Sequence, residues 1–448
     1  MALFERESHG NGLAPMEILY SDAMLEIIER LPDFESLMNF IQASPNAYRT
    51  LYPHQGLICH KLLIREFGPL LPIIVARLEA STVEWRPKRP SLWDSEQARH
   101  YSVKLGHFCD QYLSGQATKL GVPVSYFTYQ RTHALLEFHK CVSEWAKGIA
   151  VRMIQQPVVA DFTYSNTAYD RQINDRERHR VVKTLYVTEL ISMLLPQRFN
   201  LNIHLLDDDW LTFWKCFAPW EFCQYLEMQT VIFEFIRALA PLKHGLPSGR
   251  YLDELYTYMR GRSWIQLYEI LVFQAGLEAL KPALDAYLPG KPNPQPPSKL
   301  YEIIEDFIEY PEMRAQWCCR FNIQWRWRGN GRLRQIFPEY EQIWLKQASA
   351  SGGDFVAYSF DTAHIEESYT DSDEGPLACW LYDISKYGRR HDGFRLRDDP
   401  NFLMTSFWDR ARWHTAIDSK MPSMAELRED TSTKLLRDNG WVIPIPDE

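Results

Sequence analysis

The sequence predicts a mainly α-helical fold with a less regular C-terminal part. Apolar residues recur at offsets of zero, three, four and seven along much of the chain, which is the spacing of one face of an α-helix. Breaks such as Gly68-Pro69 end these periods, as glycine and proline commonly do at helix ends. Of the 448 residues, 46% are hydrophobic, which is enough for a sizeable core.

Residues 19–52 hold three short helical periods separated by two proline-marked breaks. Asp33 can cap the second period, and Ser44 can cap the third. Helices this short bury too little apolar surface to fold alone, so they need a partner protein or the rest of the chain to pack against. The apolar residues on one face of each period are Met24, Ile27, Ile28 and Leu31, then Phe34, Leu37, Met38 and Ile41, then Ala47, Tyr48 and Leu51.

This apolar spacing, read from Leu19, resembles the F-box, a small helical module that binds the Skp adaptor of cullin-type ubiquitin ligases. Asp22 stands where the family usually has an acidic residue, and Tyr20 stands where the family has a proline. The ending at residues 43–48, ASPNAY, is similar to that of divergent F-box-like proteins of filamentous fungi. The resemblance covers less than a tenth of the chain.

The resemblance implies a substrate receptor without catalytic activity. Its first three helices would dock on a Skp-type adaptor, and its larger body would recruit an unknown protein substrate. The residues expected to bind the adaptor are Leu19, Tyr20, Met24, Ile28, Leu31, Leu37, Met38 and Tyr48. The alternative is a helical structural protein that binds no adaptor. Exposure of Leu37 and Met38 separates the two interpretations, because a docking stripe must stay uncovered by its own chain.

The clearest predicted boundary is the segment PGKPNPQPPS, which is too rich in proline for regular structure. The charged residues of 361–375 predict an acidic, mobile loop. The predicted domains are an F-box-like module at 14–55, a helical body at 56–288, the proline-rich linker at 289–298 and a mixed C-terminal region at 299–448. Within the last region we expect helices at Tyr301–Ile308 and Tyr340–Gln347, and short strands near Phe394–Leu396 and Trp441–Ile445.

Composition restricts the partners and the location. The formal charge of −9, from 58 acidic and 49 basic residues, argues against nucleic acid or an anionic membrane as the main partner. No apolar stretch approaches the about 18 residues of a membrane span, and residues 1–13 lack the pattern of a secretory signal. The eight scattered cysteines indicate free thiols in a reducing compartment. We therefore expect an intracellular protein, cytoplasmic or nuclear.

The motifs that carry catalysis are weak in this sequence. Asp207-Asp208-Asp209 invites comparison with the magnesium motif of isoprenoid synthases, but consecutive aspartates point in different directions and no second motif follows. These acids are better explained as caps of the next helix. No Cys-x-x-Cys pair, Gly-x-Ser-x-Gly elbow or phosphate-binding loop is present. We predict no cofactor, no metal and no catalytic residue.

The segment 314–334 interleaves six arginines with Trp317, Trp325 and Trp327. Such a mixture can stack on RNA bases and pair with phosphates. It also suits an extended segment with tryptophans inward and arginines outward, held by cation–π contacts or by the acidic loop. Because the surrounding chain is acidic, we favour the structural interpretation over RNA binding.

Overall fold

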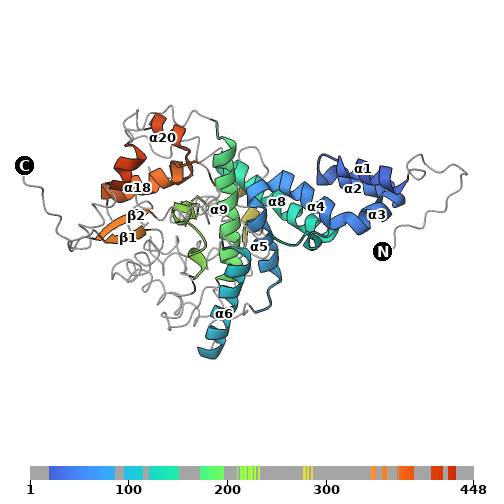
Figure 1. Cartoon of the computed structure of the whole chain (residues 1–448), viewed down its shortest axis with the longest axis horizontal. Coiled ribbons are helices and arrows are strands. Elements are labelled where there is room, and N and C mark those ends of the chain that lie inside the picture. Colours follow the sequence, from blue (N-terminus) through green and yellow to red (C-terminus); the bar gives the residue numbers. More distant parts are fainter. Residues whose placement is uncertain are drawn as a thin grey trace, which may run out of the picture. The chain divides into compact units, whose positions relative to one another are not determined.

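The computed structural model is mainly α-helical in the residues it describes, which confirms the mainly α character of the predicted fold (Figure 1). It divides into two compact units: unit 1 is Met1–Pro72 with Leu120–Phe138, and unit 2 is Ile73–Lys119 with His139–Glu448. The structure describes residues 20–85, 95–114, 121–150, 172–195, positions within 209–232 and 276–285, 345–349, 356–360, 371, 373–387, 405–416 and 422–429. The predicted linker at 289–298, the segment 314–334 and the expected elements at 301–308, 394–396 and 441–445 lie outside these residues.

Unit 1 is built from short helices whose ends follow local sequence signals. The Asp33 side chain accepts a hydrogen bond of 2.7 Å from the Ser36 N–H, which caps one helix and lowers the pKa of the Asp33 carboxyl. Ser44 caps the next helix in the same way, as predicted. The elements are α1 Ser21–Glu29, α2 Phe34–Ala43, α3 Pro45–Leu51, η2 Tyr52–His54, α4 Gln55–Phe67, η3 Gly68–Leu70, η5 Val124–Tyr126 and the first part of α8 Tyr129–Ile149.

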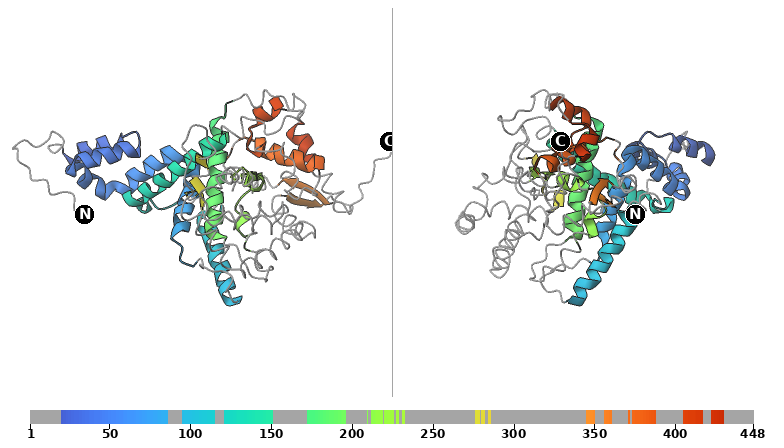
Figure 2. Two further views of the ribbon diagram at one scale, coloured as in Figure 1. Left: turned by 180° about the vertical axis from the view of Figure 1, so that it is seen from behind. Right: turned by 60° about the vertical axis from the view of Figure 1, so that its left-hand side comes forward.

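The core of unit 1 joins the first helices to a segment from much later in the sequence (Figure 2). α1 and α2 each pack on α3, and α4 packs on η5. The close approach of η5 depends on Gly56, because a Cβ atom there would lie 2.7 Å from the Val124 carbonyl oxygen. The Phe34 and Tyr129 rings pack against each other in a tilted arrangement, at a centroid distance of 5.5 Å. The chain itself therefore supplies part of the support that these short helices need.

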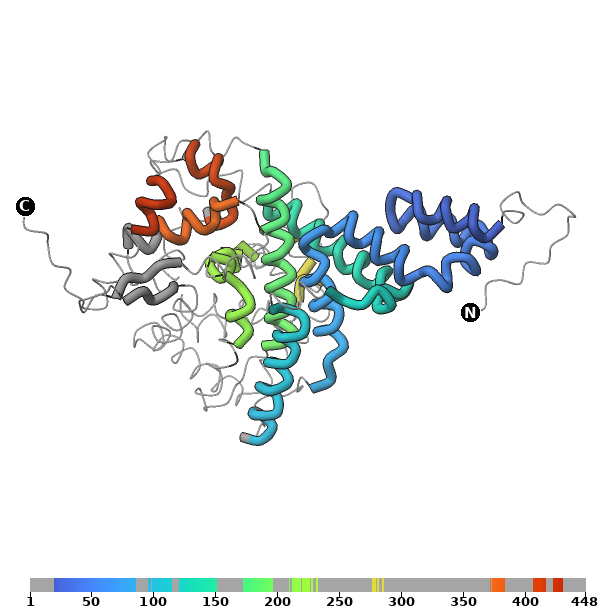
Figure 3. The backbone as a smooth tube through the Cα atoms, viewed as in Figure 1, coloured from blue at the N-terminus to red at the C-terminus, as the bar shows by residue number. Residues whose placement is uncertain are grey.

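Unit 2 is organised around α9, Asp175–Leu194, the long green helix of Figure 3. Most of the side chains of α9 are buried. α9 begins at a capping box made by Asn174 and Glu177. Side chains of three other helices reach α9: Arg77 contacts Glu189, the Tyr101 hydroxyl donates to the Leu194 carbonyl, and His139 contacts Tyr186. The other elements are α5 Leu71–Thr82, α6 Ser95–Tyr112, the second part of α8, α18 Gly375–Tyr387, η10 Thr405–Phe407 and α20 Arg410–Ala416.

A β-hairpin corrects one predicted helix. β1, Leu345–Ser349, pairs antiparallel with β2, Val356–Phe360, with Leu345 opposite Phe360. The predicted helix at Tyr340–Gln347 is therefore wrong at residues 345–347. Residues 345–347 form a strand because they pair with VAYSF, whose β-branched and aromatic residues favour strands. The local helical spacing of residues 340–347 does not reveal this partner.

Candidate functional site

The predicted adaptor-binding stripe is largely buried inside unit 1. Met24, Ile28 and Leu37 have 0% exposed surface. Leu31 and Met38 are half-buried, and the Tyr129 hydroxyl donates to the Met38 sulfur. We therefore correct the expectation that Met24, Ile28 and Leu37 face a partner. They are core residues because they lie on the faces of α1 and α2 that the rest of unit 1 covers.

Two other predicted residues, Tyr20 and Tyr48, are exposed, and Leu19 lies outside the described part of the chain. The structure adds exposed apolar residues that the sequence pattern did not single out. Among the described residues, seven of the eight exposed large hydrophobic side chains belong to unit 1, and the eighth is Val103 of unit 2. We call the seven the exposed apolar set: Tyr20, Ile27, Tyr48, Tyr52, Leu57, Ile64 and Val124.

The best defined part of this set is a tyrosine pair at the end of α3. Tyr48 is 49% exposed and Tyr52 is 62% exposed, and their ring centroids are 6.3 Å apart. They lie one helical turn apart, so their rings share one side of the helix while Ala47 and Leu51 point into the core. Exposed aromatic rings are enriched at protein interfaces because they bury a large area at low entropic cost.

A second part of the exposed apolar set lies on α4. Leu57 and Ile64 are seven residues apart and flank Lys61 on one helix face. The Lys61 ammonium lies 3.2 Å from the Glu29 carboxylate at the end of α1, and Arg65 donates to the Leu31 carbonyl oxygen at 2.6 Å. These contacts fix the end of α1 against α4, although an exposed ion pair contributes only about 0.2–1 kcal/mol.

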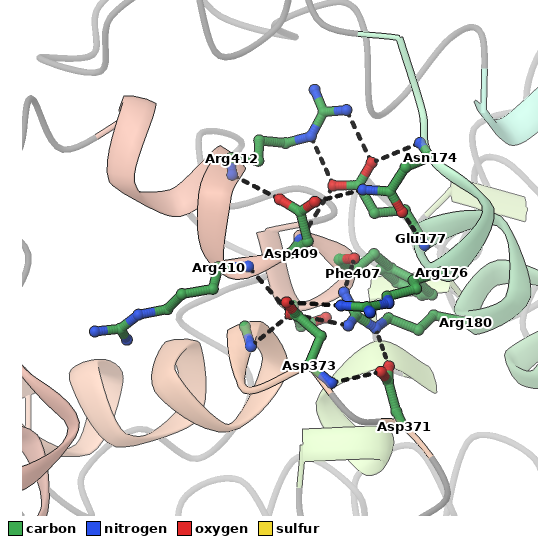
Figure 4. A network of polar contacts seen from close by, with 12 residues as sticks. Asn174, Arg176, Glu177, Arg180, Asp371, Asp373, Phe407, Asp409, Arg410 and Arg412 are labelled. Carbon is green, nitrogen blue, oxygen red and sulfur yellow. Dashed lines mark hydrogen bonds and ion pairs between the residues drawn. The ribbon is translucent and has the colours of Figure 1, made fainter.

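Unit 2 contains a network of buried charges that joins the N-terminal end of α9 to two C-terminal segments (Figure 4). Arg412 binds the Glu177 carboxylate with both nitrogens of its fork, at 2.7 Å from Nε and 2.9 Å from Nη2. Glu177 also accepts from the Asp409 N–H at 3.1 Å. Asp409 in turn accepts from the Arg412 N–H at 2.6 Å and from the Asn174 side-chain amide. The Glu177 carboxylate thus joins the cap of α9 to a segment more than two hundred residues away in the sequence.

A second arginine, Arg180 of α9, holds the residues that precede α18. Arg180 donates to Asp371, to Asp373 at 3.0 Å and to the Phe407 carbonyl oxygen at 2.9 Å. The Asp373 carboxylate also accepts from the N–H groups of Gly375, at 2.8 Å, and Arg410, at 3.1 Å. Gly375 is required here, since a Cβ atom would lie 2.3 Å from the Trp408 carbonyl oxygen.

These contacts correct part of the predicted mobile loop at 361–375. Asp371 and Asp373 are paired with Arg180, so this end of the acidic segment is held in place. Residues 361–370 lie outside the described part. The run of acidic residues at 361–375 predicted a loop exposed to solvent. Arg180, which pairs with Asp371, is nearly 200 residues away in the sequence, so no local pattern indicates this contact.

We call this network the clamp, because the contacts of Glu177 and Arg180 hold the start of α9 to residues 371–373 and 407–412. Glu177, Asp371, Asp373 and Asp409 each accept hydrogen bonds from arginines or backbone N–H groups, so these carboxylates join separate segments of unit 2. Within the described residues, no group of three or more His, Cys, Asp or Glu side chains is arranged to hold a metal ion. Asp209 is buried in unit 2, while Asp207 and Asp208 lie outside the description.

The pKa of His139 predicts acid sensitivity of unit 2. Burial beside Tyr186, whose hydroxyl lies 3.1 Å from Nδ1, lowers the pKa of His139 from 6.5 to about 4. The unfolded chain therefore binds this proton more tightly, so stability is complete above pH 6.5 and is lost as pH falls toward 4. At pH 5 the expected loss is about 1–2 kcal/mol.

Urea unfolding of the whole protein at pH 7 and pH 5, followed by tryptophan fluorescence, measures this loss. The control is His139→Gln, which stays neutral at both pH values. The variant is expected to lose less stability between pH 7 and pH 5 than the wild type. An equal loss in both proteins would contradict a role of His139.

No family model, curated protein or solved structure matches this chain. Within the described part of the chain, no helix combines the length and the apolar character that crossing a bilayer requires.

Proposed function

We propose that this protein is a non-catalytic interaction protein whose unit 1 docks on a Skp-type adaptor of a cullin-type ubiquitin ligase. Unit 2 would then recruit a protein substrate of unknown identity. The observation that carries the proposal is that, among the residues the structure describes, seven of the eight exposed large hydrophobic side chains lie in unit 1, where the sequence also resembles a divergent F-box of filamentous fungi. This proposed role implies an intracellular location, cytoplasmic or nuclear.

The docking residues in this proposal differ from the stripe that the sequence indicates. Tyr20 and Tyr48 remain candidates, and Tyr52, Leu57 and Ile64 join them because they are exposed. The tyrosine pair is the strongest candidate for the centre of the interface, since a few large aromatic residues usually carry most of the binding energy. Exposed Arg49 and Glu35 are available to form a polar rim.

The test is capture of the purified protein by an immobilised Skp-type adaptor. The double variant Tyr48→Asp, Tyr52→Asp is expected to weaken capture by about tenfold or more, because the loss of two interface aromatics costs at least about 1.4 kcal/mol. Circular dichroism of the variant should match the wild type, since both side chains are exposed.

Val103→Asp is the matched control. Val103 is 51% exposed, which is similar to the exposure of the two tyrosines, and it lies on α6 of unit 2. This variant is expected to be captured as well as the wild type. Capture of the tyrosine variant at wild-type strength would contradict the proposed interface.

A helical structural protein that binds no adaptor is the second candidate function. The complete burial of Met24, Ile28 and Leu37 favours it, because the first three helices contribute their main apolar faces to the protein's own core. Absence of capture of the wild-type protein, at adaptor concentrations of about 100 μM, would select this candidate.

A further inference from the structure

The helix α6 of unit 2, labelled in Figure 1, presents a basic side to solvent. Val103 lies in the middle of this side and is, among the described residues, the one exposed large hydrophobic side chain of unit 2. Residues four apart lie on the same side of a helix, so this side consists of two adjacent rows. We call it the basic face of α6, and its exposed members are Arg99, Val103 and His107 in one row and His100 and Lys104 in the other.

The opposite side of α6 belongs to the core of unit 2. Leu105 has 0% exposed surface, Phe108 is buried, and the Tyr101 hydroxyl donates to the carbonyl oxygen at the end of α9. An amphipathic helix that binds a membrane inserts its apolar side into the bilayer. Because the apolar side of α6 is held inside the protein, α6 meets a partner through its basic face.

The two fixed cations of the basic face are not neutralised by the described part of the chain. The side chains of Arg99 and Lys104 form no ion pair or hydrogen bond with any described residue. Lys61 and Arg178, which are also exposed, each have a carboxylate nearby, at 3.2 Å and 3.7 Å. The whole chain carries a formal charge of −9, so the basic face departs from the average of the protein. A face of this kind attracts a partner of opposite charge.

The dimensions of the basic face match a short extended peptide. Each step of four residues along the row from Arg99 through Val103 to His107 is about 6 Å long. Alternate side chains of an extended peptide face the same way and lie about 6.6 Å apart. A peptide of about five residues can therefore place three side chains opposite this row. Glu96 and Asp110, both exposed, lie beyond the two ends of the row and repel further acidic residues.

We propose that the basic face of α6 binds an extended segment of a partner protein that carries an acidic, an apolar and a second acidic residue at alternate positions. One carboxylate pairs with Arg99, whose planar guanidinium binds carboxylates through two N–H groups. The second carboxylate meets Lys104 and a ring N–H of His107, and the apolar side chain covers Val103. That this partner is the protein substrate of unit 2 rests on the proposed function, whereas the binding itself does not.

Nucleic acid and lipid fit the basic face less well. A single-stranded nucleic acid stacks its bases on aromatic side chains and follows a groove lined by many cations. The basic face has two fixed cations, Arg99 and Lys104, and none of its five residues is Phe, Tyr or Trp. An anionic membrane is bound by larger clusters of Lys and Arg or by several inserted apolar side chains, and this face offers Val103 alone.

The test uses the whole protein and a fluorescein-labelled peptide with the sequence glycine–glutamate–serine–leucine–serine–glutamate, titrated by fluorescence anisotropy. The expected dissociation constant lies between about 10 μM and 1 mM, because few contacts form. A peptide with glutamine in place of both glutamates is expected to bind about tenfold more weakly or worse. When photo-leucine replaces the leucine, irradiation is expected to label the tryptic peptide 100–104, which contains Val103.

Two double variants locate the charges that matter. Arg99→Glu with Lys104→Glu is expected to weaken binding of the glutamate peptide by about tenfold or more, because both charge pairs become repulsive. The matched control is Arg178→Glu with Lys147→Glu, which replaces one exposed arginine and one exposed lysine of unit 2 outside α6. The control is expected to bind within about twofold of the wild type, since distant surface charges are screened by salt. Circular dichroism of both variants should match the wild type, because all four side chains are exposed.

Four outcomes would overturn the proposal. They are equal weakening by the two double variants, full-strength binding of the glutamine peptide, photo-labelling confined to peptides outside α6, and tighter binding of oligouridine or of vesicles of equal parts phosphatidylserine and phosphatidylcholine. Adaptor capture is measured separately. If capture fails while the glutamate peptide still labels residues 100–104, the adaptor role is lost and the basic face of α6 is supported.

Discussion

Replacing Arg412 by alanine is expected to lower the free energy of unfolding of unit 2 by about 3–5 kcal/mol. Arg412 is 2% exposed and Glu177 has 0% exposed surface, so the variant leaves a carboxylate in the interior without its bidentate partner. The free energy of a buried ion pair is small when both partners are present, but the cost of leaving one charge alone is large. The same change also releases the Gln172 carbonyl oxygen, which accepts from Arg412 at 3.1 Å.

Tryptophan fluorescence during urea unfolding measures this effect on unit 2 alone. All 15 tryptophans of the chain fall in unit 2, and Trp408 and Trp413 pack at 5.5 Å beside the clamp. The midpoint of the fluorescence change therefore reports the segments that Arg412 holds. A shift to lower urea with an unchanged slope is the expected result.

Arg178→Ala is the control for this prediction. Arg178 lies next to Glu177 on α9 and also pairs with a carboxylate, that of Asp175 at 3.7 Å, but the side chains are 62% and 87% exposed. An exposed pair of this kind contributes at most about 1 kcal/mol. If Arg412→Ala destabilised unit 2 by no more than Arg178→Ala, the clamp would not stabilise the fold.

Local signals predicted the helices of unit 1 and their caps. The zero, three, four, seven spacing of Phe34, Leu37, Met38 and Ile41 marks α2, and Asp33 caps it. Such features depend on residues within one or two turns of each other, so they can be recognised without knowledge of the rest of the fold. The direction in which each face points depends on more distant residues.

The exposure of the predicted site could not be derived from this spacing. Met38 meets Tyr129, which is 91 residues away, and periodicity alone does not distinguish a face that the chain covers from one that a partner covers. The clamp gave no sequence signal for the same reason, since Glu177 and Arg412 are 235 residues apart. Charged residues in such pairs look like solvated surface when the sequence is read locally.

Leu37→Ala is expected to destabilise unit 1 by about 2–5 kcal/mol. Leu37 lies at the centre of α2 with no exposed surface, so the shorter side chain loses buried contacts and leaves a cavity. Leu37→Asp would cost more, because it also buries a charge without a partner. The loss of adaptor capture by a Leu37 variant would therefore report unfolding rather than a lost contact, which is why the tyrosine pair is the proper test of docking.

Hydrogen exchange of the amides in α1–α4 measures this prediction, because unit 1 contains no tryptophan. Leu57→Ala is the matched control: it removes the same atoms from the same unit, but Leu57 is 43% exposed, so its expected cost is about 0.5 kcal/mol or less. Tryptophan fluorescence should remain that of the wild type in both variants, since the substitutions lie outside unit 2. Similar exchange in the two leucine variants would mean that Leu37 is not a core residue, and the original docking stripe would then regain its support.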